Sequence, residues 1–230
     1  MIFVTADLHI GHRAIALHTN RKQFIYPNPD YDPEKPKDFK NNWPLAVKLE
    51  EHDQFLIDNY NRMVGKKDTT IIIGDFIWKN EMHNLQRFNG KKILIVGNHD
   101  NGSQLYLKQF TEVHDFLTRT FERKYFCTFF HYPMISWPGS CYGSWQFHGH
   151  CHGRITEFID SLRCDCGVDV WDYKPIPWEV LKKKMESRMP YWRDKVKNRE
   201  LEEQKTDTVA ELREKNRLHR IGKENKKNSS

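Results

Sequence analysis

The amino-acid sequence predicts an α/β domain followed by a charged, mainly helical extension. Short runs of β-branched and aromatic residues are typical of buried strands, and segments with helical spacing lie between several of them. Hydrophobic residues make up 38% of the 230 residues, which suits a packed core. Residues 1–180 carry 21 Lys/Arg and 22 Asp/Glu, whereas residues 181–230 carry 16 and 9. The excess positive charge therefore belongs to the extension, and we place the boundary of the domain at residue 180.

Each of five predicted strands is followed directly by polar residues of the metal-binding type. In sheets with helical crossovers, ligands bind beyond the carboxyl ends of the strands, where loops from separate strands converge. We therefore expect these polar side chains to meet at one point. The runs and the residues that follow them are 2–5 with Asp7 and His9, 69–73 with Gly74 and Asp75, 92–96 with Gly97, Asn98, His99 and Asp100, 126–130 with His131, and 145–147 with His148, Gly149, His150 and His152.

The remaining segments are predicted from periodicity and composition. Apolar spacing predicts helices over residues 44–64, 80–89 and 103–111. Proline, glycine and asparagine without periodicity predict surface loops over residues 20–42 and 132–144. Residues 178–218 are rich in Glu, Lys and Arg and are expected to be helical, and residues 219–230 are expected to be disordered. An apolar and acidic segment is expected to form a strand that closes a sheet: Asp169, Trp171, Asp172 and Tyr173.

Cysteine usage and the apolar pattern indicate a cytoplasmic protein. The chain has five cysteines and no export signal, because the apolar stretch after Met1 is too short for a signal peptide. We expect these thiols to be reduced. No apolar run approaches the roughly 20 residues needed to span a bilayer, so no membrane partner is expected.

The polar residues that follow the strands suit a pair of divalent ions. Imidazole and carboxylate ligands bind Mn, Fe, Zn, Ni or Mg, with amide and water oxygens in other positions. A site with two ions roughly 3.5–4 Å apart needs a carboxylate that bridges them and two or three further ligands for each ion. The five loops supply enough ligands for two ions, and Mn is the first expectation. These ligands are Asp7, His9, Asp75, Asn98, His131, His150 and His152.

The same motifs, in this order, resemble the calcineurin-like metallophosphoesterase superfamily. Each motif alone is common, but five of them in order behind predicted strands are specific. The resemblance implies two mixed β-sheets packed face to face and flanked by helices in a four-layer sandwich, with the metals at one edge. The protein Ser/Thr phosphatases of this superfamily have a second aspartate and Arg-Gly after Gly-Asp. Here Phe76, Ile77 and Trp78 follow Asp75, so the likeness is to the small bacterial and phage-type phosphoesterases.

The resemblance also implies a role for each residue of the motifs. One ion is held by Asp7, His9, Asp75 and His152, and the other by Asp75, Asn98, His131 and His150. Asp75 then bridges the two ions. His99 lies near the leaving-group oxygen, and Asp100 fixes the orientation of His99. A water or hydroxide shared by two cations has a lowered pKa and attacks phosphorus in line, while a histidine serves the departing oxygen.

Five further residues are candidates for substrate contact, and each has a structural alternative. His12 and Arg13 follow the first motif, and Arg154 follows the last, so they either meet the phosphate or lie on the surface. Trp137 and Tyr142 either stack on a base or other flat leaving group or pack in the core or in a lid. His148 stands two residues before His150, and we interpret it as a residue that either supports the ligands or has a structural role.

The expected function is the metal-dependent hydrolysis of a phosphodiester, or a phosphomonoester, in a small or nucleotide-like substrate. Two alternatives stay open. One is a nuclease or nucleic-acid-associated phosphoesterase in which residues 181–230 make weak, salt-sensitive contacts with nucleic acid. The other is a non-catalytic scaffold with the same fold, although such a protein is expected to lack some ligands or His99, and this chain lacks none.

Overall fold

The computed structural model describes residues 1–19, 21–38, 42–78, 81–100 and 103–227, with side chains described as far as residue 202. Its larger sheet has five strands in the order β11-β1-β4-β5-β6. Four strands are parallel, and β11 pairs with β1 in the antiparallel sense. The strands are β1 (Ile2–Thr5), β4 (Thr69–Ile73), β5 (Lys91–Ile95), β6 (Glu112–His114) and β11 (Ile176–Pro177).

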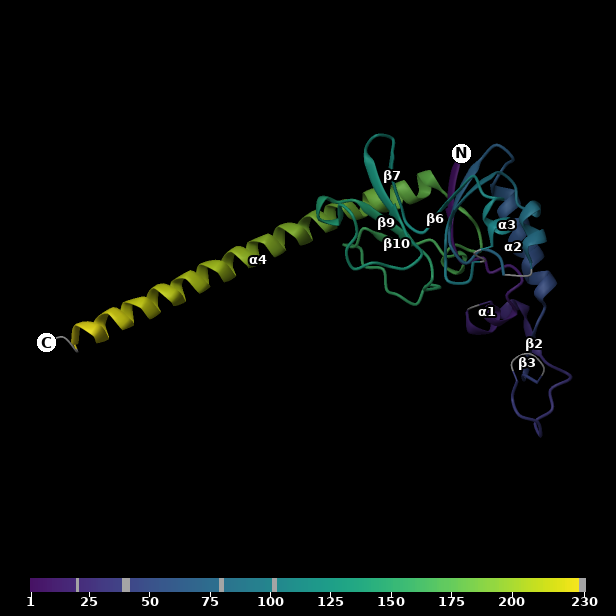
Figure 1. Cartoon of the computed structure of the whole chain (residues 1–230), viewed down its shortest axis with the longest axis horizontal. Helices are drawn as coiled ribbons and strands as arrows, with labels where there is room; N and C mark the ends of the chain where they lie inside the picture. The colour runs from purple at the N-terminus through teal and green to yellow at the C-terminus, as the bar shows by residue number, and fades with distance from the viewer. Residues whose placement is uncertain (20, 39–41, 79–80, 101–102, 228–230) are drawn as a thin grey trace.

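The second sheet has four strands in the order β10-β9-β8-β7. Here β8, β9 and β10 are parallel and β7 is antiparallel, so this sheet is also mixed. The strands are β7 (Leu117–Phe121), β8 (Tyr125–Phe129), β9 (Trp145–His148) and β10 (Arg163–Asp165). A small antiparallel ribbon of β2 (Ile25–Pro27) and β3 (Leu45–Val47) lies apart from the two sheets (Figure 1).

The two sheets pack face to face because their strands alternate apolar side chains between two faces. Val4 and Ile71 of the larger sheet share a buried cluster with Phe129 and Phe147 of the second. The intervening residues of the larger sheet point the other way, as Ile72 shows, and join a second buried cluster under the helices. The mixed sheets, packed together with helices outside, confirm the predicted fold class.

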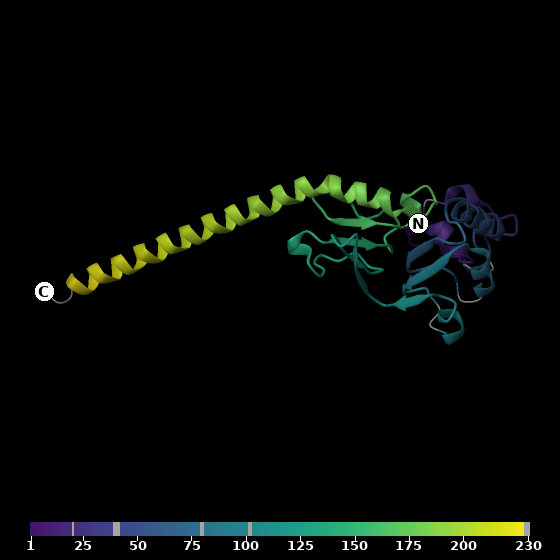
Figure 2. The ribbon, with the colours of Figure 1, turned by 90° about the horizontal axis from the view of Figure 1, so that it is seen from above.

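Helices cover the outer face of the larger sheet and extend the chain beyond it. Leu56 and Tyr60 of α2 and Tyr106 of α3 belong to the cluster on that outer face. The N-terminal part of α4 packs against the core through Leu181, Met185 and Met189, and its C-terminal part projects away from the body (Figures 1 and 2). The helices are α1 (Arg13–His18), α2 (Leu49–Met63), α3 (Gln104–Leu107) and α4 (Trp178–Lys227). Within the described residues, no helix is both long enough and apolar enough to cross a membrane.

Several predicted element boundaries were wrong. The helix expected over residues 44–64 begins at Leu49, because Leu45–Val47 pairs with Ile25–Pro27 as β3. The helix over 80–89 is a 3₁₀ segment, η2 (Met82–Arg87), and the helix over 103–111 is the short α3. The loop over 20–42 contains η1 (Lys22–Phe24) and β2, with residues 20 and 39–41 outside the described residues, and the loop over 132–144 contains η3 (Ser140–Tyr142).

The C-terminal segments also differ from the expectation. Asp169 lies in the 3₁₀ turn η4 (Val168–Val170), and the strand that closes the larger sheet is Ile176–Pro177 instead. Helix α4 continues to Lys227, past residue 218 where the disordered end was expected, and residues 228–230 lie outside the described residues. The domain boundary at residue 180 stays a prediction.

Candidate metal centre

Loops that follow five strands bring the predicted ligands together at one edge of the two sheets. Two groups form, and in each of them the ligand atoms lie within 4.8 Å of one another. The first group is Asp7, His9 and His152, and the second is Asp75, His131 and His150. Parallel strands place their carboxyl ends on one edge, which explains why residues distant in sequence converge.

Asp75 lies between the two groups. Its Oδ2 is 3.5 Å from Nε2 of His9 and 3.4 Å from Nε2 of His131. Its Oδ1 accepts a hydrogen bond from the backbone N–H of His99 at 2.8 Å. One carboxylate oxygen is therefore fixed by the backbone, while the other faces both groups, as a bridging ligand must.

The side-chain amide of Asn98 completes the second group. Its Oδ1 lies 3.0 Å from Nε2 of His131 and 3.1 Å from Nδ1 of His150. The hydroxyl of Tyr132 also donates to this oxygen, at 3.4 Å. Tyr132 was not predicted as a site residue, although it directly follows a predicted ligand.

Two glycines let these loops approach one another closely. A Cβ atom on Gly74 would lie 2.4 Å from Nδ1 of His131, and Gly74 has a φ of +78°. A Cβ on Gly149 would lie 2.7 Å from Oδ2 of Asp7. Any larger residue at either position would displace a predicted ligand, which explains the Gly-Asp and Gly-His pairs of the sequence.

Much of the backbone strain in the described chain is concentrated at the ligands. Nine non-glycine residues have positive φ, and five of them belong to the two groups. Left-handed backbone is uncommon for residues with a Cβ and persists only when the surrounding structure enforces it. The five residues are Asp7 (58°), His9 (53°), Asp75 (52°), His150 (69°) and His152 (49°).

Burial and neighbouring charges shift the pKa values of the cluster. Burial raises the pKa of Asp7 to about 7 and lowers the pKa of His9 well below its usual value. Burial also favours the neutral form of His131. Its hydrogen bond to Asp75 and the negative charges of Asp7 and Asp75 outweigh that effect and raise the pKa of His131 to about 9. Two buried carboxylates that face imidazoles favour the binding of positive charge.

The donor set fits divalent metal ions. Nε2 of His9 is buried and, among the described residues, has no hydrogen-bond partner. Nδ1 of His131 donates to the carbonyl oxygen of Ile73 at 2.9 Å, and Nδ1 of His152 donates to Asp169 at 2.7 Å. Histidines that bind metal commonly donate their other ring N–H to a carbonyl or carboxylate in this way. The residues therefore match an imidazole and carboxylate site for two ions.

Comparison with known proteins places this site in a family. A model of the calcineurin-like phosphoesterases matches residues 1–216. The chain belongs to the calcineurin-like phosphoesterase family. Members of this family are generally metal-dependent phosphoesterases, which agrees with the two groups of candidate ligands.

Relatives and a solved structure extend this result. An uncharacterised protein of Methanocaldococcus jannaschii is 26% identical over 196 residues, which cover 80% of this chain and 91% of that protein. The gene 66 protein of Mycobacterium phage L5 is 33% identical over 102 residues, which cover 42% of this chain and 38% of that protein. A crystal structure of a protein of unknown function from Aquifex aeolicus has a TM-score of 0.52 at 21% identity, covering 80% of this chain and 98% of that one, and shows the shared fold.

His99 and Asp100 of this family member have different surroundings. The His99 ring lies beside the cluster, with its centroid 5.3 Å from that of His9. Asp100 does not hydrogen-bond to His99 in the described structure. Its carboxylate instead accepts hydrogen bonds from the backbone N–H groups of Asp75, Phe76 and Gly97. The expectation that Asp100 orients the His99 ring is therefore corrected.

His12 lies at the cluster, whereas Arg13 lies on the surface. Nδ1 of His12 is 3.1 Å from Nδ1 of His9, and the rings of His12 and Trp78 stack at 3.9 Å and 13°. Burial lowers the pKa of His12 to about 4, so its imidazole is neutral at pH 7. Arg13 begins α1 and is exposed, and the described structure gives it no hydrogen bond or ion pair. Trp78 was not predicted as a site residue, because its role depends on a contact between two loops.

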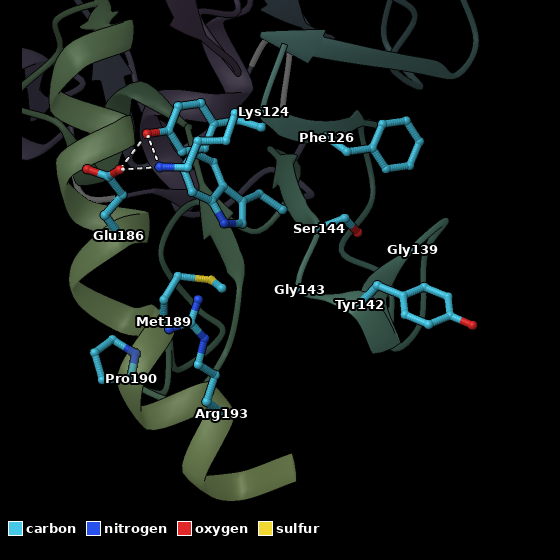
Figure 3. Close-up of a pocket in the computed structure, with 12 residues that line it drawn as sticks. Lys124, Phe126, Gly139, Tyr142, Gly143, Ser144, Glu186, Met189, Pro190 and Arg193 are labelled. Atoms are coloured by element: carbon cyan, nitrogen blue, oxygen red, sulfur yellow. Dashed lines mark hydrogen bonds and ion pairs between the residues drawn. The ribbon is translucent and has the colours of Figure 1, made fainter. Parts of the chain in front are cut away.

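The other three candidates for substrate contact have partners outside the two ligand groups or are exposed. The guanidinium of Arg154 donates to the carbonyl oxygen of His18, and its side chain is exposed. Trp137 packs against the core between the sheets and donates to the carbonyl of Ser144 at 3.2 Å. Tyr142 is 89% exposed and borders a cavity of about 630 Å³ between its loop and α4 (Figure 3). The described structure brings neither aromatic residue into contact with the ligand groups.

His148 occupies the structural position that was expected. It is buried in β9, and its Nδ1 donates to the carbonyl of Gly149 at 3.0 Å. In the register of the second sheet it faces Asp165 of β10. It belongs to neither ligand group.

Proposed function

We propose that this chain is a phosphoesterase that uses two divalent metal ions, with manganese as the first candidate, to hydrolyse a phosphodiester bond. The observation that carries the proposal is the position of Asp75 Oδ2, within 3.5 Å of histidine nitrogens from both ligand groups. The first ion is assigned to Asp7, His9, Asp75 and His152, and the second to Asp75, Asn98, His131 and His150.

The protein's own residues position the reaction. Divalent ions bound to these ligands supply Lewis acidity, which lowers the pKa of water and neutralises charge on the phosphoryl oxygens. The half-buried ring of His99 stands beside the ligands and is the candidate donor to the leaving oxygen. Neutral His12, stacked on Trp78 and 5.0 Å from the His99 ring centroid, borders the same space. The substrate is a small or nucleotide-like phosphodiester, and a phosphomonoester is the alternative.

The direct test compares bis-p-nitrophenyl phosphate with p-nitrophenyl phosphate. Protein stripped with a chelator is resupplied with Mn, Ni, Mg or Zn, and Asn98→Ala and His99→Ala are assayed in parallel. We expect metal-restored activity that both variants lose, with the diester preferred. Full activity in the chelated protein, or in Asn98→Ala, would contradict the proposal. Restored activity with the monoester preferred would assign the same centre to phosphomonoesters.

The projection of α4 supports contact with nucleic acid as a second proposal. Helix α4 extends from the body into solvent, and residues 181–230 carry 16 Lys/Arg against 9 Asp/Glu (Figure 2). We expect weak binding that does not depend on base sequence and that salt abolishes. Fluorescence anisotropy with labelled DNA tests it, with Arg213, Arg217 and Arg220 replaced by Gln. Binding that is unchanged in this triple variant would contradict the proposal.

A cytoplasmic location, which the five free cysteines support, stays a prediction.

A further inference from the structure

Arg21 is fully buried behind the loop that carries Asp7 and His9. Its Nη2 donates to the carbonyl oxygen of Asp7 at 2.6 Å, and its Nη1 donates to the carbonyl oxygen of Leu8 at 2.9 Å. Both Asp7 and His9 have left-handed backbone. Two donors from one rigid guanidinium therefore hold the turn that presents these two candidate ligands.

The same guanidinium binds Asp169 with two hydrogen bonds. Nε donates to Oδ1 at 2.9 Å and Nη2 donates to Oδ2 at 2.8 Å. Oδ2 of Asp169 also accepts the N–H of His152 Nδ1 at 2.7 Å. With Nδ1 used in this way, Nε2 of His152 is the nitrogen left for an ion. Arg21 is thus bonded to the backbone of Asp7 and of Leu8, which precedes His9, and is linked through Asp169 to His152. Its contacts therefore reach the loops that carry all three members of the first ligand group.

The connection extends to α2. Nη1 of Arg21 lies 2.9 Å from Nε2 of His52, which must accept because a guanidinium only donates. Nδ1 of His52 then donates to Oδ1 of Asp53 at 2.7 Å, and Oδ2 of Asp53 accepts the backbone N–H of Gly11 at 2.9 Å. All five N–H groups of Arg21 and both ring nitrogens of His52 therefore have partners along this path. A buried, satisfied network of this kind holds its members in one arrangement.

The second ligand group is held by different contacts. His131 donates to the carbonyl of Ile73, and the turn at Asp75 is held by Asp100. His150 is exposed, and its ring nitrogen faces Asn98. Arg21 and Asp169 make no hydrogen bond to a member of this second group in the described structure. The direct support is therefore to one of the two ion positions, and the second group meets it through the backbone N–H of His150, which donates to the carboxylate of Asp7.

We propose that Arg21 and Asp169 are positioning residues for the ion bound by Asp7, His9 and His152. Asp169 fixes His152 with Nε2 directed to the ion, and Arg21 holds both Asp169 and the Asp7–Leu8 turn. This proposal rests on the proposed function of a two-ion phosphoesterase. It adds the residues that set the affinity of one ion without touching it.

The test measures the two ion affinities separately. Mn²⁺ binding to the full-length protein is followed by competition with a chelator, and the d–d spectrum of the Co²⁺ form reports the geometry at each position. The variants are Asp169→Asn and Arg21→Lys, alone and combined. Arg188 and Glu157 form the matched control, because Arg188 is also buried and its Nη2 binds Glu157 at 2.5 Å. Glu157→Gln therefore replaces a half-buried carboxylate bound to an arginine outside the ligand groups.

We expect Asp169→Asn to weaken one ion about 10- to 100-fold and to leave the other within about twofold, the usual range for an outer partner of a metal-binding histidine. The combined variant should lose less than the product of the single losses, because both residues act through one connection. Glu157→Gln should change neither affinity. Long-range ¹H–¹⁵N spectra of the metal-free protein should show the proton of His152 on Nδ1.

The outcomes separate this role from the proposed function. A wild-type protein that binds fewer than two ions would overturn the proposed function and this role with it. Two bound ions with both affinities unchanged in Asp169→Asn would overturn the positioning role alone. So would an equal loss at both positions, an equal loss in Glu157→Gln, or a proton on Nε2 of His152. Unfolding curves in chelator confirm that each variant is folded before the affinities are compared.

Discussion

The backbone N–H of Asp75 donates to the carboxylate of Asp100 at 2.9 Å, although 25 residues separate them. The same carboxylate accepts the N–H of Phe76 at 3.0 Å and that of Gly97 at 2.8 Å. Its Oδ1 also accepts the hydroxyl of Tyr106 at 3.2 Å. Asp100 therefore ties the loop after β4 to the loop after β5, and so fixes the strained turn at Asp75.

Replacing Asp100 by Ala should destabilise the metal-free protein. Three backbone N–H groups would lose their acceptor, and each buried unsatisfied donor costs about 1–3 kcal/mol. Since water will reach some of them, we expect the free energy of unfolding to fall by about 2–4 kcal/mol. Urea denaturation in chelator measures it. The control is Asp58→Ala, which removes an exposed partner of Gln54 and should change little. Equal stability of Asp100→Ala and wild type would refute this role.

Ion binding should release protons, because the metal-free cluster holds them. The pKa of His131 is raised to about 9 and that of Asp7 to about 7. An ion must displace these protons, so its affinity should rise with pH from 6 to about 9 and level off above that. Titration calorimetry in two buffers of different ionisation enthalpy counts the protons, taken over the cluster as a whole. Affinity that is flat between pH 6 and 9, without proton release, would be inconsistent with these shifts.

Trp78 should affect substrate binding through His12. The stack at 3.9 Å keeps the His12 ring beside His9 and His99. Replacing Trp78 by Ala removes that contact, and an aromatic pair is worth about 0.5–1.5 kcal/mol. We therefore expect KM for the diester to rise roughly 3- to 10-fold with both ions still bound. Steady-state kinetics and metal analysis check this, with Tyr142→Ala as the exposed control. A changed metal content with normal KM would show that Trp78 acts on the ligands instead.

Lys92 should give the protein a pH-dependent stability at alkaline pH. Its ammonium is buried and donates to the carbonyls of Phe88 at 2.7 Å and Gly90 at 3.0 Å. Burial lowers its pKa to about 8 from 10.5. Between these values the unfolded chain binds more protons than the folded one, so the free energy of unfolding contributed by Lys92 rises with pH. Urea unfolding from pH 7.5 to 10 should show this rise, which Lys92→Met loses and the exposed neighbour Lys91→Met retains. An identical pH profile for Lys92→Met would disprove it.

The candidate ligands could be predicted from the sequence because each is a residue type that binds metal and each closely follows a predicted strand. Asp7, Asp75 and His131 each follow a strand whose β-branched and aromatic residues are easily recognised. The topology of parallel strands then brings such residues together without any further information. The shape of the core follows in the same way from the alternation of side chains along each strand.

Residues that act through long-range contacts could not be predicted. Arg21 lies in a segment without periodicity, and its partner Asp169 is 148 residues away. An aspartate between Val168 and Val170 signals a buried carboxylate that needs a cation, but the sequence does not say which one. The predicted start of the helix over residues 44–64 was wrong for a related reason. Leu45–Val47 pairs with Ile25–Pro27, a strand in a region that was predicted to be a loop.

Anomalous diffraction from Mn²⁺-loaded crystals can show whether two ions share Asp75. We predict two anomalous peaks roughly 3.5–4 Å apart, one within reach of Asp7, His9 and His152 and the other within reach of Asn98, His131 and His150, with Asp75 coordinating both. One peak alone, or two peaks that do not share Asp75, would show that Asp75 does not bridge two ions.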